Sequence, residues 1–69
     1  MNPKISIIIL NWNTKEFLKN CIGSIRKHIN IVTNSYEIIV VDNGSSDGSA
    51  RMIKTCFPHV KLIEINANL

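Results

Sequence analysis

The 69-residue sequence is poor in the residues that mark several common kinds of binding site. It contains one Trp, one Tyr and two Phe, and eight basic residues are scattered along the chain against five acidic ones, for a net charge of +3. Proteins that bind single-stranded nucleic acid combine a basic groove with several aromatic stacking platforms. The composition therefore argues against a nucleic-acid partner.

Cysteine is also scarce, and no apolar run is long. Cys21 and Cys56 lie far apart with no C-x-x-C motif, so the four-ligand zinc sites are excluded. Each cysteine falls on the apolar side of a predicted helix, and we expect both to be reduced thiols in the core. The apolar run 5–10 is far shorter than a membrane span, and no signal-peptide cleavage site follows it. We therefore expect a cytoplasmic chain.

Three runs rich in β-branched residues predict strands, at residues 5–10, 37–41 and 60–65. The first two are almost continuously apolar, which is typical of strands buried on both faces in a parallel sheet. Lys61 and Glu64 interrupt the third run, which suits the edge of a sheet.

Two helical patterns lie between these strands. The first is expected to open near Thr14, with Asn13 as its N-cap and Glu16 as the capping-box partner. The second follows the turn residues 43–49 and ends at Pro58. The residues predicted to face the core are Phe17, Leu18, Cys21, Ile22, Ile25 and Ile29 in the first helix, and Ala50, Ile53, Cys56 and Phe57 in the second.

This order of elements predicts an α/β fold of the βαβαβ type. Right-handed crossovers make the three strands parallel, in the order 3-2-1, and place both helices on one face of the sheet. The other face then has no cover, although the strand at 5–10 offers apolar side chains to both faces. We therefore expect that face to be buried by another chain.

Polar residues follow each predicted strand, at the edge of a parallel sheet where ligands bind. One aromatic residue, one carboxylate and several amides meet there, a combination that suits a nucleoside, although turn chemistry alone also explains the Asn and Asp residues. No Gly-rich phosphate loop and no nucleophile–base pair is present, so no catalytic or metal-binding residue is assigned. The nucleotide-binding candidates are Asn11, Trp12, Asn13, Asp42, Asn43, Gly44 and Asn68.

Residues 5–13, 21–25, 36–49 and 57–64 resemble the N-terminal part of family 2 glycosyltransferases. The most specific part is the block Asp42-Asn43-Gly44-Ser45-Ser46-Asp47-Gly48-Ser49, and the resemblance covers essentially the whole chain. It implies the Rossmann-like GT-A fold, whose first half is a nucleotide-binding βαβαβ unit. It also implies transfer of a sugar from a nucleotide diphosphate donor, usually with Mg2+ or Mn2+, in the synthesis of polysaccharides or other glycans.

The resemblance also implies roles for individual residues. Trp12 stands where many members place an aromatic residue on the base, with Asn11 and Asn13 beside it. Asp42 matches the first carboxylate of the family's acidic block, and Asn43 replaces the second, with a carbonyl that can accept a hydrogen bond from N3–H of uracil or thymine. Asn68 matches an Asn that usually precedes x-Gly-Phe. The donor is therefore expected to be a UDP- or dTDP-sugar.

The family's Asp-x-Asp metal motif and catalytic base lie beyond the position that matches Leu69. We therefore expect residues 1–69 to form a single partial domain, the donor-nucleotide half of a GT-A enzyme, which binds nucleotide weakly and transfers no sugar. The full-length enzyme is expected to need Mg2+ or Mn2+ and to act at the cytoplasmic face of the membrane.

Two other readings stay open. One is a non-catalytic α/β module that binds a partner or self-associates through its bare sheet face. The other is a receiver-like phosphoacceptor with Asp42 as the acceptor, which is weakened because Asn11 and Asn13 stand where receivers carry acidic residues. Whether the 69-residue chain is itself an enzyme is left undecided by its sequence.

Overall fold

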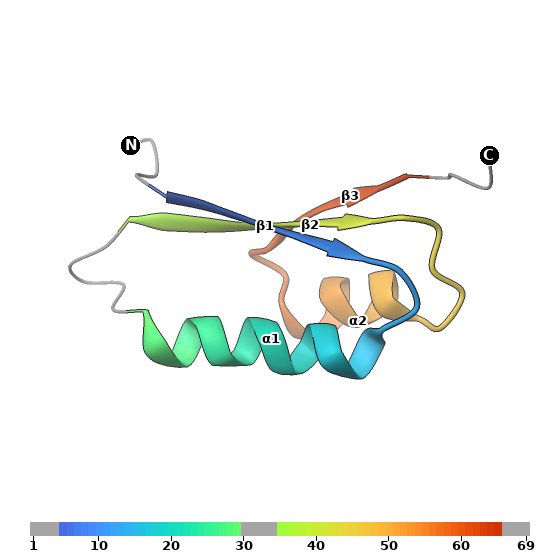
Figure 1. The fold of residues 1–69 in the computed structure, drawn as a ribbon, viewed down its shortest axis with the longest axis horizontal. Helices are drawn as coiled ribbons and strands as arrows, with labels where there is room; N and C mark the ends of the chain where they lie inside the picture. The colour runs from blue at the N-terminus through green and yellow to red at the C-terminus, as the bar shows by residue number, and fades with distance from the viewer. Residues whose placement is uncertain (1–4, 30–34, 66–69) are drawn as a thin grey trace.

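The computed structural model describes residues 5–29 and 35–65, so the candidate Asn68 lies outside the described residues. The chain forms five elements in the predicted βαβαβ order (Figure 1). Their bounds differ from the predicted ones by one or two residues at most ends. The elements are β1 (Ile5–Asn11), α1 (Lys15–His28), β2 (Tyr36–Asp42), α2 (Ser49–Cys56) and β3 (Lys61–Glu64).

The three strands form one parallel sheet in the order β1-β2-β3, with β2 in the centre. The predicted order 3-2-1 names the same neighbours from the opposite edge of the sheet. Ile5 pairs with Tyr36 and Asn11 with Asp42, so β1 and β2 end at the same level. The α/β fold is therefore confirmed, and it brings the loops that follow β1 and β2 to one rim.

Both helices lie on the same face of the sheet, as Figure 1 shows. The core lies between them and the sheet, because alternate residues of β2, such as Ile38 and Val40, point towards the helices. The remaining members of the core are Leu18, Ile22, Ile53, Phe57 and Val60.

Within the part of the chain that the structure describes, no helix lies over the opposite face of the sheet. The exposed large hydrophobic residues of the strands include Ile8 and Leu10 on β1 and Ile63 on β3. In the sheet register Leu10 lies beside Val41, and Val41 beside Ile63, so these residues form a continuous apolar row. The bare face is confirmed; its burial by another chain stays a prediction. Within the described residues, no helix is long and apolar enough to cross a membrane.

The predicted core face of α1 is partly wrong. Leu18 and Ile22 are buried, but Phe17 is 74% exposed and Cys21 only half-buried. The reason is that the described strands and helices bury only the side of α1 that carries Leu18 and Ile22. Phe17 and Cys21 lie on the adjacent side, which continues the apolar pattern but is not fully covered by any described element.

The cysteines are free thiols, but the prediction that both lie in the core is wrong. Cys56 is exposed, because α2 buries only the line that runs from Ser49 through Ile53 to Phe57 just after the helix. Cys56 follows Ile53 by three residues, which places it about 60° from Ile53 around the helix axis. A short helix buries a narrow stripe, and the apolar pattern of the sequence is wider than that stripe.

Candidate functional site

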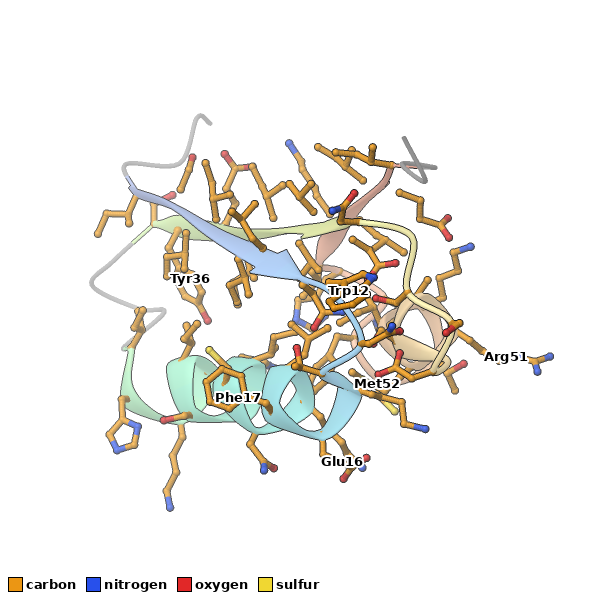
Figure 2. All side chains as sticks on the ribbon, turned by 45° about the vertical axis from the view of Figure 1, so that its right-hand side comes forward. Trp12, Glu16, Phe17, Tyr36, Arg51 and Met52 are labelled. Atoms are coloured by element: carbon orange, nitrogen blue, oxygen red, sulfur yellow. The ribbon has the colours of Figure 1, made fainter. Side chains whose placement is uncertain are left out.

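The loops that follow β1 and β2 lie side by side. The backbone N–H of Asn43 donates to the carbonyl oxygen of Asn11 at 2.9 Å, which extends the β1–β2 ladder beyond the strand ends. Figure 2 shows Trp12 at the end of β1. The structure therefore brings six of the seven predicted site residues to one rim: Asn11, Trp12, Asn13, Asp42, Asn43 and Gly44.

Two of these residues, Asn11 and Asp42, are each only 3% exposed. The Asn11 side-chain amide donates to Oδ1 of Asp42 at 2.8 Å, and its Oδ1 accepts from the Thr14 hydroxyl at 2.7 Å. Burial of these polar groups would cost free energy without such partners. These hydrogen bonds therefore fix the positions of Asn11 and Asp42, from which the two loops begin.

Ser45, which sequence reasoning did not single out, is the centre of this network. Its Oγ donates to Oδ1 of Asp42 at 2.6 Å and accepts from the Asn13 N–H at 2.9 Å and the Asn11 side-chain amide at 3.2 Å. Its own backbone N–H donates to Oδ2 of Asp42 at 3.1 Å. The spacing Asp-x-x-Ser was the available signal, since an Asp side chain often closes a turn on the residues that follow it.

The predicted capping box at the start of α1 is wrong. Asn13 adopts the left-handed conformation, with φ of 52°, and its Oδ1 accepts from the Ser46 N–H at 2.7 Å instead of capping the helix. Thr14 is the N-cap residue and makes no side-chain capping bond. The left-handed turn at Asn13 points its side chain to the neighbouring loop, so this residue ties the β1 loop to the β2 loop.

Asp47 caps the helix in place of Asn13. Its Oδ2 accepts from the Lys15 N–H at 2.9 Å, at the first residue of α1, and its Oδ1 accepts from the Ser49 N–H at 3.0 Å, at the first residue of α2. One carboxylate therefore satisfies backbone donors at the starts of both helices. The hydroxyl of Ser49 and these backbone N–H groups lower the pKa of Asp47 from its ordinary value of 3.8.

Above the braced loops lies a shallow hollow of about 390 Å³ on the bare side of the sheet. Trp12 and Asn43, both exposed, contribute to its wall, and Trp12 is 63% exposed. Leu10, Asn11, Val41 and Ile65 complete the lining. Even-numbered residues of β1 face this side, and Trp12 continues their alternation. An indole face and an amide beside an apolar floor can hold a flat polar ring.

Gly44 borders a second hollow, of about 280 Å³, together with Asp42, Ser45, Glu64 and Ile65. Its φ of 71° lies in the left-handed region, which glycine adopts without steric cost. A residue with a side chain would strain the turn here and narrow the rim of the loop.

The described residues do not suit a metal ion. Across residues 5–29 and 35–65 no three His, Cys, Asp or Glu residues gather in a position to share one. Asp42, which borders the second hollow, is buried and already accepts bonds from Asn11 and Ser45. His28 and His59 are exposed, and His28 bonds to the Ser24 carbonyl near the far end of α1.

Comparison with known proteins adds independent findings. The family model described as Glycosyl transferase family 2 matches residues 6–69. The Glycosyltransferase AglE of Haloferax volcanii is 31% identical over 64 residues, which cover 88% of this chain and 21% of that protein. The undecaprenyl-phosphate 4-deoxy-4-formamido-L-arabinose transferase of Yersinia pestis is 35% identical over 69 residues, covering 94% and 21% respectively. The chain thus spans about a fifth of the length of these relatives.

Proposed function

This chain belongs to glycosyl transferase family 2, and on this premise we propose that it forms the donor-nucleotide half of a glycosyltransferase. The donor is of the UDP- or dTDP-sugar type, and the acceptor is a polysaccharide or other glycan. The observation that carries the proposal is the hollow at the ends of β1 and β2, where Trp12 and Asn43 stand over a rigidly bonded loop pair.

The chemistry of the hollow suits a pyrimidine base. The exposed indole of Trp12 offers a stacking surface, worth about 1–3 kcal/mol per base. The Asn43 side chain carries both an acceptor and a donor, so it can accept from N3–H of uracil or thymine and donate to the adjacent ring carbonyl. This combination selects a ring with an N–H next to a carbonyl.

The buried residues have a different part in the proposal. Asn11, Asp42 and Ser45 bond to one another beneath the loops, so they act as positioning residues that hold Trp12 and Asn43 at a fixed separation. Gly44 and Asn13 shape the rim where the ribose and diphosphate would lie. Because its carboxylate is buried and bonded, Asp42 is a poor candidate for a phosphoacceptor, which disfavours the receiver-like reading.

The Mg2+ or Mn2+ expected in the full-length enzyme remains part of the proposal. The described residues do not fit such an ion, because no three His, Cys, Asp or Glu side chains gather among them. The Yersinia relative is named for a transferase acting with undecaprenyl phosphate, a lipid phosphate. We therefore propose that the glycan acceptor is linked to a lipid and that the reaction takes place at the cytoplasmic face of the membrane.

Titration with nucleotides tests the base site. Trp12 is the single Trp of the chain, so its fluorescence reports on this position alone. We expect UDP and dTDP to change the Trp12 emission and the NMR shifts of the two loops at millimolar concentration, and CDP to bind at least about threefold more weakly because cytosine has no N–H at N3. Asn43→Ala should weaken UDP binding about tenfold.

The matched control is Asn20→Ala, which removes an exposed amide from α1, far from the rim. Its UDP affinity should equal that of the unchanged chain. Emission that stays constant with saturating UDP, or equal losses in the Asn43 and Asn20 variants, would refute the base site. A non-catalytic self-association module, the second reading, would instead show concentration-dependent size with no nucleotide response.

A further inference from the structure

The hollow beside Trp12 is built from two rows of side chains that follow the register of the sheet. Leu10 and Val41 are paired in the register of β1 and β2 and form the lower row. Two backbone bonds continue this register past the strand ends, from the Asn43 N–H to the end of β1 at 2.9 Å and from the Ile65 N–H to the end of β2 at 2.8 Å. Trp12, Asn43 and Ile65 therefore form the upper row.

Hydrogen-bond acceptors are scarce in this hollow. Among the described residues that line it, Asn43 is the one exposed side chain that can accept a hydrogen bond. Asn11 also lines the hollow, but its side chain is buried and bonded to Asp42 and Thr14. The indole of Trp12 has an N–H donor and no acceptor. A flat ring on Trp12 therefore meets one acceptor and, beyond it, aliphatic side chains.

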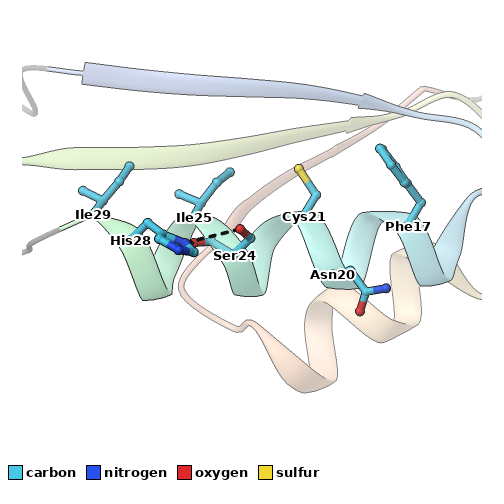
Figure 3. A pocket seen from close by; sticks show the side chains of 7 residues that line it. All are labelled: Phe17, Asn20, Cys21, Ser24, Ile25, His28 and Ile29. Carbon is cyan, nitrogen blue, oxygen red and sulfur yellow. Dashed lines mark hydrogen bonds between the residues drawn. The ribbon is translucent and has the colours of Figure 1, made fainter.

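A larger hollow along α1, of about 530 Å³, lacks this arrangement. It also has an aromatic residue, Phe17, and an amide, Asn20. Figure 3 shows Phe17 pointing from the helix towards the sheet and Asn20 pointing the other way. The ring and the amide of this hollow do not face the same space, so the hollow beside Trp12 is the better match for a base.

We propose that the hollow beside Trp12 prefers thymine to uracil, which makes dTDP-sugars the favoured donors. This inference rests on the proposed function, because it requires a pyrimidine in this hollow. The residues that determine the preference are Leu10, Val41 and Ile65, which we call the aliphatic floor.

The single acceptor decides which side of the base meets the aliphatic floor. In a uracil or thymine nucleotide the base has one hydrogen-bond donor, N3–H, so this group bonds to Asn43. The C5–C6 edge lies across the ring from the C2–N3 edge and has no hydrogen-bonding atom. With N3–H at Asn43, the C5–C6 edge points away from the amide and towards the floor. The 5-methyl group, which is the one difference between the two bases, then lies against aliphatic side chains.

The floor has apolar surface for this methyl group to cover. Leu10 is 79% and Ile65 44% exposed, and Val41 is half-buried. Full burial of one methyl group strengthens binding about fourfold. Because the hollow is shallow, we expect thymine to bind about threefold more tightly than uracil.

Titration with four nucleoside diphosphates tests the preference. UDP and 5-methyl-UDP differ in the methyl group alone, and so do dUDP and dTDP. The 2′-hydroxyl is the same within each pair, so its contribution cancels. Followed by Trp12 emission and by NMR shifts, the methylated member of each pair should bind about threefold more tightly.

Polar substitutions in the floor show whether these side chains cause the preference. Leu10→Ser and Val41→Thr should each reduce it to less than about twofold, and the combined variant should bind both members of a pair equally. Because Leu10 is largely exposed, circular dichroism should show a retained fold for Leu10→Ser. The matched control is Ile63→Ser, since Ile63 lies beside Val41 in the register but does not line the hollow. This variant should keep the threefold preference.

The possible failures are distinguishable. Equal affinities within both pairs, with a clear Trp12 response, would overturn the thymine preference and leave the base site in place. A preference that survives in the combined floor variant would also overturn it, because the methyl group would then act through stacking on Trp12 alone. No response to any of the four nucleotides would refute the proposed function itself, and this inference with it.

Discussion

At the scale of single residues, the sequence indicated which loops meet at one rim but did not separate residues that face outward from residues that support them. Asn11 and Trp12 are neighbours, yet Asn11 is 3% and Trp12 63% exposed. The strand alternation explains the difference, because Ile8, Leu10 and Trp12 share the bare side while Asn11 points to the helix side. Ser45 was missed because its importance arises from bonds to residues more than thirty positions away in sequence.

Replacing Ser45 with Ala tests its place in the network. The change removes the hydroxyl that donates to Asp42 and accepts from the Asn13 N–H. A buried group left without its partner costs about 1–3 kcal/mol, so we expect unfolding free energy to fall by about that amount in urea titrations. Ser46→Ala is the control, since Ser46 bonds to Asn13 mainly through its backbone N–H and should lose less than about 0.5 kcal/mol. Equal losses in both variants would contradict the network.

At the scale of elements, the apolar patterns predicted all five segments, because a run of β-branched residues and a helical repeat are local properties. The cap at the start of α1 depends on a residue that is distant in the sequence. The first N–H of the helix is capped by Asp47, which lies on the loop before α2, so the capping group cannot be found from the residues around Thr14. Phe17 and Cys56 were wrongly assigned to the core because the apolar pattern of a helix does not show how much of that helix the sheet covers.

Asp47→Ala should loosen both helices at once. The variant loses the acceptor for the Lys15 N–H and for the Ser49 N–H, and a lost N-cap costs about 0.5–2 kcal/mol of stability. We expect a destabilisation of about 2 kcal/mol in thermal or urea unfolding, with faster hydrogen exchange in the first turns of both helices. Glu16→Ala, an exposed carboxylate in the first turn of α1, is the control and should change stability by less than about 0.5 kcal/mol. Faster exchange confined to α2 would show that Asp47 does not cap α1.

The same carboxylate should make stability depend on pH. Because the native pKa of Asp47 lies below 3.8, the unfolded chain binds more protons than the native chain between that lowered pKa and 3.8. The stabilising contribution is thus complete above this window and is lost as the pH falls through the native pKa. The pKa of Glu37 is lowered in the same sense, by the Ser6 hydroxyl first and by Lys61.

Asp47→Asn should therefore flatten the loss of stability below pH 4, when melting temperature is followed from pH 6 to pH 2.5. Glu37→Gln removes the second acid-sensitive group and separates its contribution. If the melting temperature of Asp47→Asn falls with pH as steeply as that of the unchanged chain, another group causes the acid sensitivity.

At the scale of the whole molecule, the fold class and the bare sheet face followed from the order of elements and the handedness of crossovers. The sequence did not show what covers the bare face. Contacts with another chain or segment produce an excess of apolar residues, but that excess does not identify the partner. The row of Leu10, Val41 and Ile63 runs from β1 across the bare face of the sheet. Leu10 and Val41 also line the hollow beside Trp12, so this hollow opens onto the apolar face.

Nucleotide binding by the 69-residue chain as a whole is expected to be weak. We expect the hollow to contact a base and a ribose, but the described residues provide no cluster of metal ligands for a diphosphate. Arg51 and Lys54 lie on α2, and Lys54 already pairs with Glu64 at 3.1 Å. We therefore expect UDP to bind with a dissociation constant near millimolar, about −4 kcal/mol, and Mn2+ to change it less than about twofold.

Calorimetric titration of UDP and uridine, each with and without Mn2+, measures these dissociation constants directly. Uridine should bind nearly as well as UDP, because base and ribose supply most of the contacts. Micromolar affinity that depends on Mn2+, or sugar release from a UDP-sugar, would show that the chain forms a metal site that the described residues do not contain.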